Sequence, residues 1–100
     1  YSYYLANKDK IKAAAINGVK PSLEGIQDYS YPIARPLFFY AKKAHVGVVP
    51  GLKEFLDAFT SKKAMGSRGY LTDVGLVPLA SDKYKVTRTA AKDLVTINLK

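Results

Sequence analysis

Apolar residues recur at helical spacing from residue 52 to residue 59, whereas the positions between them are mostly charged. A stripe of this kind is typical of an amphipathic helix with one face in a core. Pro50 suits the first turn, because it lacks the N–H that would be left unpaired there. The pattern therefore predicts a helix over residues 50–61.

Three further helices are predicted by shorter signals. Ser81 and Asp82 form a start signal with a favourable first-turn charge, so residues 81–93 are expected to be helical. Pro21 and Ser22 open a helix that ends before Pro32, since the residue before a proline is pushed out of the α region. Residues 1–8 are interpreted as the end of a helix, stopped by a polar Asn-Lys-Asp run.

Two stretches favour strands. Residues 35–41 are dense in aromatics, with proline at the start and two lysines beyond the end. Both faces are apolar, which indicates a central or covered strand. Residues 11–16 form a short apolar run closed by an Asn-Gly turn signal, so a short buried strand is expected. Residues 95–99 are expected to form a short strand or a docked tail.

Glycine and proline interrupt residues 64–79 four times, which predicts an irregular segment with one short helical turn near residues 62–65. Helices that alternate with strands favour a layered α/β fold. Two strands make a poor sheet, so the sheet is expected to be completed by something outside these residues, either a missing part of the protein or a second copy.

Length and composition support one small domain with a modest core: 100 residues, of which 48% are hydrophobic. The chain opens within an aromatic cluster at Tyr1, so we expect a preceding element, with which a signal peptide could have been lost. The absence of cysteine excludes disulfides, thiolate metal sites and cysteine nucleophiles.

A net charge of +8 leaves several kinds of partner open. The basic residues are scattered, as expected for a solvated surface, but they also suit nucleic acid, an anionic membrane or an anionic ligand. No RNA-binding motif is present, so nucleic acid is not the expected partner.

Catalytic chemistry has little support in the sequence. His45 is the only histidine and has no cysteine or neighbouring carboxylate to complete a metal site. Glu24 and Asp28 lie four residues apart, but no apolar setting would tune one of them as an acid. The glycines do not form a phosphate-binding loop. We therefore expect that the protein is not an enzyme and that it binds neither a metal nor a cofactor.

A series of short motifs, taken in order, resembles a segment near the C-terminus of phosphate-binding proteins that serve bacterial ABC importers. The similarity covers about residues 1–79. The motifs are Asn17-Gly18, Pro21-Ser22-Leu23-Glu24, Tyr31-Pro32-Ile33-Ala34-Arg35-Pro36-Leu37, Val49-Pro50-Gly51-Leu52-Lys53-Glu54-Phe55, Gly69-Tyr70-Leu71 and Gly75-Leu76-Val77-Pro78-Leu79.

The resemblance implies a two-lobed binding protein of the periplasmic type II class, with inorganic phosphate held between the lobes. The expected fold is a partial periplasmic-binding-protein-like layered α/β fold, with a small sheet and flanking helices. Residues 1–100 would be one C-terminal segment, and a strand near residues 34–42 would cross the hinge. The membrane subunits of an ABC transporter would be partners, and the location would be periplasmic or at the cell surface.

The resemblance also restricts the site residues that can be predicted. The family's phosphate-holding motifs lie upstream of this segment, so no ligand contact is carried over. Ser2 and Arg35 are the two ligand-binding candidates, and Tyr31, Pro32, Arg35 and Pro36 are the expected structural residues of the hinge. The predicted function is a substrate-binding component for phosphate uptake. The alternatives are a small basic polyanion-binding module or an inert segment without activity alone.

Overall fold

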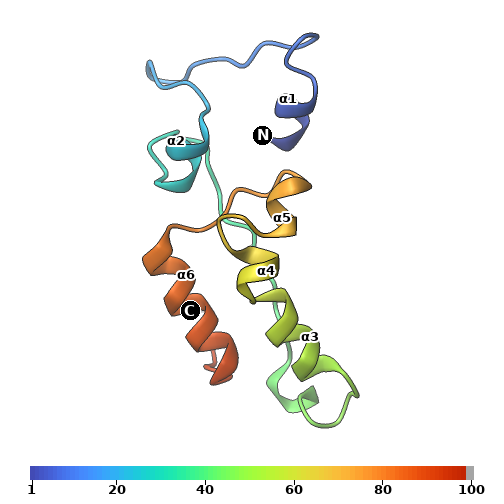
Figure 1. The fold of residues 1–100 in the computed structure, drawn as a ribbon. Helices are drawn as coiled ribbons and strands as arrows, with labels where there is room; N and C mark the ends of the chain where they lie inside the picture. Colours follow the sequence, from blue (N-terminus) through green and yellow to red (C-terminus); the bar gives the residue numbers. More distant parts are fainter. Residues whose placement is uncertain (99–100) are drawn as a thin grey trace.

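The computed structural model describes residues 1–98, and its regular structure is helical (Figure 1). The elements are α1 (Ser2–Ala6), α2 (Leu23–Gln27), the short 3-10 helix η1 (Lys43–His45), α3 (Leu52–Phe59), α4 (Lys62–Met65), α5 (Tyr70–Asp73) and α6 (Ser81–Lys92).

The best-packed part of the molecule is formed by α3, α4 and α6. In Figure 1, α6 lies beside the continuous path of α3 and α4. Leu56 and Ala64 are buried there, and so is Tyr84 of α6. The Tyr84 hydroxyl donates to the Thr60 carbonyl at 3.0 Å, while the Thr60 hydroxyl donates to the Leu56 carbonyl at 2.8 Å. These bonds satisfy the hydroxyls of Tyr84 and Thr60 where α6 meets the C-terminal end of α3.

The N-terminal part is held by turns and single contacts. Ser22 caps α2, and its side chain accepts from the Gly25 N–H at 2.9 Å. Asn17 and Gly18 both have positive φ, as a type I′ turn requires, and they join the single antiparallel bridge between Ile16 and Val19. α1 and α2 lie at the end of the molecule opposite η1 (Figure 1).

The predicted small sheet is not confirmed, because no strand occurs between residues 1 and 98. Residues 11–15 and 34–42 carry neither helix nor strand. The strand predictions for residues 11–16 and 35–41 are therefore wrong for this structure, except that the Asn-Gly turn is confirmed. A strand requires a hydrogen-bonded neighbour, and residues 1–98 present none to either segment beyond the bridge from Ile16 to Val19. A strand or docked tail was predicted for residues 95–99. Residues 95–98 form no strand, and Leu99 lies outside the described residues.

The helix predictions are confirmed to within a few residues. The stripe at 50–61 forms α3, the 81–93 signal forms α6, and the predicted turn near 62–65 is α4. Ser81 is the first helical residue rather than the cap, because Ala80 holds the cap position and makes no side-chain bond. The sequence patterns did not predict η1 or α5, each of which is a single turn.

The chain is more extended than a self-sufficient domain of its size. Its radius of gyration is 16.0 Å, whereas a compact domain of this length has about 13 Å. The accessible surface is 7875 Å², against roughly 5,600 Å² expected for a folded monomer of this mass. No helix within residues 1–98 is long and apolar enough to cross a membrane.

Candidate functional site

The segment of residues 31–36, predicted to flank a hinge, is anchored at Tyr31. Its backbone N–H donates to the Gly25 carbonyl at 2.8 Å, and its hydroxyl donates to the Ala14 carbonyl at 3.3 Å. The Ala34 N–H closes a turn onto the Tyr31 carbonyl at 2.9 Å, and Ala34 is buried. Tyr31 therefore joins the end of α2 to the residues that precede the Asn-Gly turn.

Arg35 folds back onto its own segment. Its Nη1 atom donates to the carbonyl of Ala34 at 2.8 Å and to that of Pro32 at 3.3 Å. These two hydrogen bonds from one guanidinium nitrogen fix the backbone direction between the prolines at positions 32 and 36. This geometry is that of a structural arginine, although the guanidinium has further donors to offer.

Residues 37–40 alternate like a strand although they have no strand partner. The Phe38 and Tyr40 rings, two residues apart, stack with centroids 6.0 Å apart. Phe39 lies against α3 instead, with its ring 5.6 Å from that of Phe55 and 5.2 Å from that of Phe59. This period of two is the side-chain geometry of an extended chain.

Apolar side chains are exposed along this segment, and its backbone is free. Leu37 is 82% exposed and Phe38 is 70% exposed. Within the part of the chain that the structure describes, the backbone groups of residues 36–41 form no backbone–backbone hydrogen bond. An apolar run with unpaired N–H and C=O groups is a template for strand pairing. We name residues 35–41 the open-strand segment.

Ser2, the other ligand-binding candidate, lies elsewhere. It is exposed near the start of α1 and packs against the turn after α5, where a Cβ added to Gly75 would collide with the Ser2 side chain. No hydrogen bond joins Ser2 to Arg35 within the described residues. The structure therefore does not bring the two candidates together into one site.

The pKa of the Asp28 carboxyl is shifted away from the range that a general acid needs. Hydrogen bonds from the backbone N–H and the side chain of Ser30 lower the pKa of the Asp28 carboxyl, with a smaller contribution from the positive charge of Lys83. A general acid would need a raised pKa. His45 ends the single turn η1, and no group of three metal-ligating side chains occurs within residues 1–98.

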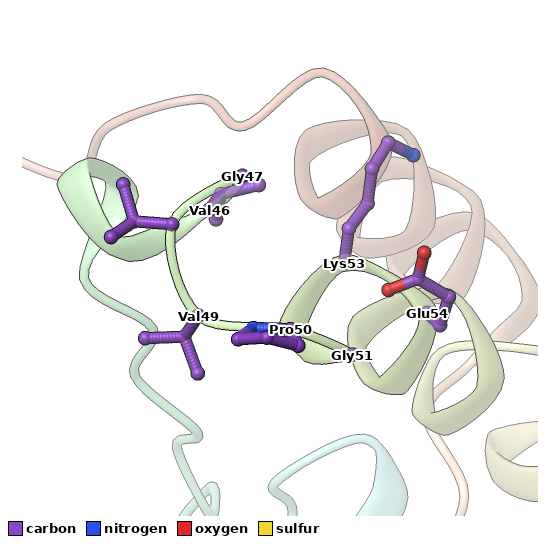
Figure 2. Close-up of a pocket in the computed structure, with 8 residues that line it drawn as sticks. Val46, Gly47, Val49, Pro50, Gly51, Lys53 and Glu54 are labelled. Atoms are coloured by element: carbon purple, nitrogen blue, oxygen red, sulfur yellow. The ribbon is translucent and has the colours of Figure 1, made fainter.

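A hollow of about 320 Å³ lies between the Val46–Gly51 loop and the first turn of α3 (Figure 2). In this view Lys53 and Glu54 rise from α3, while the side chains of Val46 and Val49 point to the opposite side. Lys53 forms an ion pair with Asp57 at 3.2 Å. Because its cation is paired and a carboxylate shares the lining, this hollow offers no net charge to an anion.

The sequence patterns missed three long-range contacts. These are the bond from Tyr84 to Thr60, the bond from the Gln27 amide to the Pro78 carbonyl at 3.0 Å, and the contact of Ser2 with Gly75. The partners are 24 to 73 positions apart, with the last value the difference between 75 and 2. No local pattern indicates such pairs. The apolar stripe that contains Phe55 and Phe59 predicted a packed face of α3, but it did not indicate that Phe39 would lie against it.

Comparison with known proteins supports the resemblance. Residues 2–63 match the family model described as a PBP superfamily domain. The chain is similar to the phosphate-binding protein PstS of Staphylococcus saprophyticus, with 26% identity over 100 residues, which cover 95% of this chain and 30% of that protein. It is 37% identical over 95 residues to protein SphX of Synechococcus elongatus, covering 84% of this chain and 25% of that protein.

A third relative covers the whole chain. The phosphate-binding protein PstS of Staphylococcus aureus is 30% identical over 105 aligned positions, covering 100% of this chain and 31% of that protein. The chain thus spans less than a third of the length of these curated relatives. No solved structure matches it. Because the family model matches more than half of its length, the chain belongs to the PBP superfamily.

Proposed function

We propose that this chain is the C-terminal part of a binding protein that captures inorganic phosphate for an ABC transporter, outside the cytoplasm in the periplasm or at the cell surface. Its role is to supply a hinge-crossing strand and part of a lobe core, with no chemical step. The observation that carries the proposal is the family match over residues 2–63, which contains the whole open-strand segment.

The shape of the chain supports a role as one part of a larger sheet protein. The open-strand segment has strand-like alternation, an exposed apolar side and an unpaired backbone. The relatives named phosphate-binding protein PstS are more than three times as long as this chain. We infer that upstream residues of the longer protein provide the neighbouring strands. Pairing there would satisfy the backbone and cover Leu37 and Phe38.

The proposed mechanism is closure of two lobes around a non-covalently held oxyanion. Phosphate favours closure only by as much as it binds the closed state more tightly than the open state. The prolines at 32 and 36 and the Arg35 bonds to two carbonyls restrict bending to the ends of the crossing segment. Family membership favours this function over a polyanion-binding module.

The test has two stages. Intact mass under denaturing conditions first shows whether the natural product is near 11.0 kDa or about threefold larger. Calorimetry with inorganic phosphate then compares this chain with the longer protein. We expect saturable, sulfate-resistant binding by the longer protein and none of that kind by this chain. Absence of phosphate binding by the longer protein would refute the proposed function.

A hinge variant refines this test. In the longer protein, Pro36→Gly is expected to weaken phosphate binding several-fold, because a freer crossing lowers the population of the closed state. Pro78→Gly, outside the crossing, is the control and should change affinity little. Equal losses in the two variants would contradict a hinge at residues 34–42.

A further inference from the structure

A second hollow, of about 400 Å³, lies where α4 and the loop after it meet the start of α6. Its polar lining comes from different elements: Gln27 from α2, Lys62 from α4, Ser67 and Arg68 from the loop, and Ser81 and Tyr84 from α6. No carboxylate lines it. It differs in this respect from the hollow near α3, where Glu54 lines the wall and Lys53 is paired with Asp57.

The charged residues that line this hollow are both basic, while the acidic residue Asp82 lies beside it in the first turn of α6. Lys62 and Arg68 both face solvent, and neither forms a salt bridge within residues 1–98. From residue 61 to residue 72 the sequence contains three basic residues and no acidic one. Two unpaired cations beside a concave surface raise the local concentration of anions.

Backbone donors lie beside these cations. The N–H groups of Ser67 and Arg68 have no backbone acceptor within the described residues, although the Gly69 N–H closes the loop onto the Gly66 carbonyl at 2.8 Å. The loop is too tightly folded for a side chain at either glycine. A Cβ at Gly66 would collide with the Lys62 carbonyl, and one at Gly69 would collide with the Ala64 carbonyl. The two free N–H groups are therefore held in a fixed loop.

α6 carries further donors that have no acceptor among the described residues. The helix runs for 12 residues and has no side-chain cap, so the N–H groups of its first turn, beginning at Ser81, lack a capping acceptor. One turn beyond Tyr84 on the same face, the Nη1 atom of Arg88 is buried with no hydrogen-bond partner among the described residues. The uncapped start of α6 lies at the hollow, with Asp82 as the acidic residue of its first turn, whereas Arg88 is not among the residues that line it.

We propose that this hollow is a binding site for a small tetrahedral oxyanion, such as phosphate or sulfate. Lys62 and Arg68 supply the charge, the Ser67 and Arg68 N–H groups and the Ser67 and Ser81 hydroxyls supply directed donors, and the start of α6 adds its positive end. The site is separate from the phosphate capture between lobes proposed above. Because its donors face solvent, it is expected to bind weakly and to accept phosphate and sulfate alike.

The experiment is a backbone amide NMR titration of this chain with inorganic phosphate and with sulfate, at constant ionic strength held with chloride. We expect saturable shifts centred on Ser67, Arg68 and Ser81 with either oxyanion. Removing both cations in Lys62→Gln/Arg68→Gln should weaken binding on the order of fivefold. The matched control is Lys63→Gln/Lys85→Gln, which removes the same charge outside the hollow.

Either of two other results would overturn the proposal. Shifts that fail to saturate, or that weaken equally in the control variant, would indicate general screening of a basic surface. A response to phosphatidylglycerol vesicles but not to free phosphate would indicate a headgroup surface rather than a site for a small ion. Circular dichroism of each variant confirms that α6 and α3 remain folded.

The outcome is independent of the proposed function. If this chain shows no saturable amide shifts, the proposal of phosphate capture between the lobes of the longer protein is not affected. Conversely, a longer protein that fails to capture phosphate selectively does not affect the amide shifts of Ser67 and Arg68.

Discussion

Two regions of this chain are built from similar amounts of apolar residues but bury them very differently. In residues 52–92 the helices α3, α4 and α6 enclose Leu56, Ala64 and Tyr84, and a side-chain hydrogen bond joins α6 to the end of α3. In residues 1–42 the two helices have five residues each, and the aromatic open-strand segment lies largely exposed. Hydrophobic content alone therefore does not make a core, because the apolar faces must also find a partner within the chain.

The largest expected difference in stability between the two regions comes from truncating one buried and one exposed leucine to alanine. Leu56→Ala is expected to destabilise this chain by about 2–4 kcal/mol, because it removes buried methyl groups and leaves a cavity between α3 and its neighbours. Leu37→Ala, at the 82% exposed position, should change it by less than about 0.5 kcal/mol. Urea unfolding followed by circular dichroism measures both.

The Leu37→Ala variant also tests whether the open-strand segment is covered in the longer protein. If upstream strands cover the open-strand segment, Leu37→Ala should become destabilising by about 1–3 kcal/mol in the longer protein. An equally small effect in both contexts would show that the segment stays uncovered and would contradict its role in a lobe core.

The contact between α6 and the end of α3 is tested by Tyr84→Phe. Loss of the hydroxyl leaves the Thr60 carbonyl without this donor in a buried place, and the expected cost is about 1–2 kcal/mol. Tyr40→Phe is the control, because the Tyr40 side chain is 60% exposed and forms no hydrogen bond with the described residues. Equal stabilities of the two variants in urea unfolding would rule out a contribution from this bond.

A smaller effect is expected in the N-terminal region from Ser22→Ala. The Ser22 side chain caps α2, so its removal should cost about 1 kcal/mol locally and raise amide hydrogen exchange in residues 23–27. Ser81→Ala is the contrasting variant, since Ser81 forms no cap bond. The expectation fails if exchange in α2 is unchanged.

The smallest effect concerns pH and the turn after α2. Bonds from Ser30 lower the pKa of Asp28 below its ordinary value of 3.8. The carboxylate therefore contributes stability above that value, and the contribution is lost as pH falls through the lower folded-state pKa. An NMR titration of the Asp28 carboxyl and the Ser30 amide should show a common midpoint below 3.8. In Ser30→Ala the midpoint should move upward, and an unmoved midpoint would argue against the side-chain part of this effect.

The helices show what the sequence by itself determined. The stripe that ends at Phe59, the Ser81-Asp82 start and the cap at Ser22 are each a local signal beside the helix they specify, so local geometry is enough to specify α3, α6 and α2. The Asn17-Gly18 turn was likewise predictable, because its two positive φ values require those residue types. The motif order that indicated the family is also a property of the sequence alone.

Tertiary structure decided whether the apolar runs became strands and which distant groups met. Residues 35–41 have strand composition and strand-like alternation, yet no sheet forms within residues 1–98, because a strand is defined by a neighbour and the described residues offer none to this segment. The meeting of Lys62, Arg68 and Ser81 around one hollow, and of Tyr84 with Thr60, depends on how α6 packs against α3 and α4. Such contacts arise from the packing of whole helices, and local propensity carries no information about them.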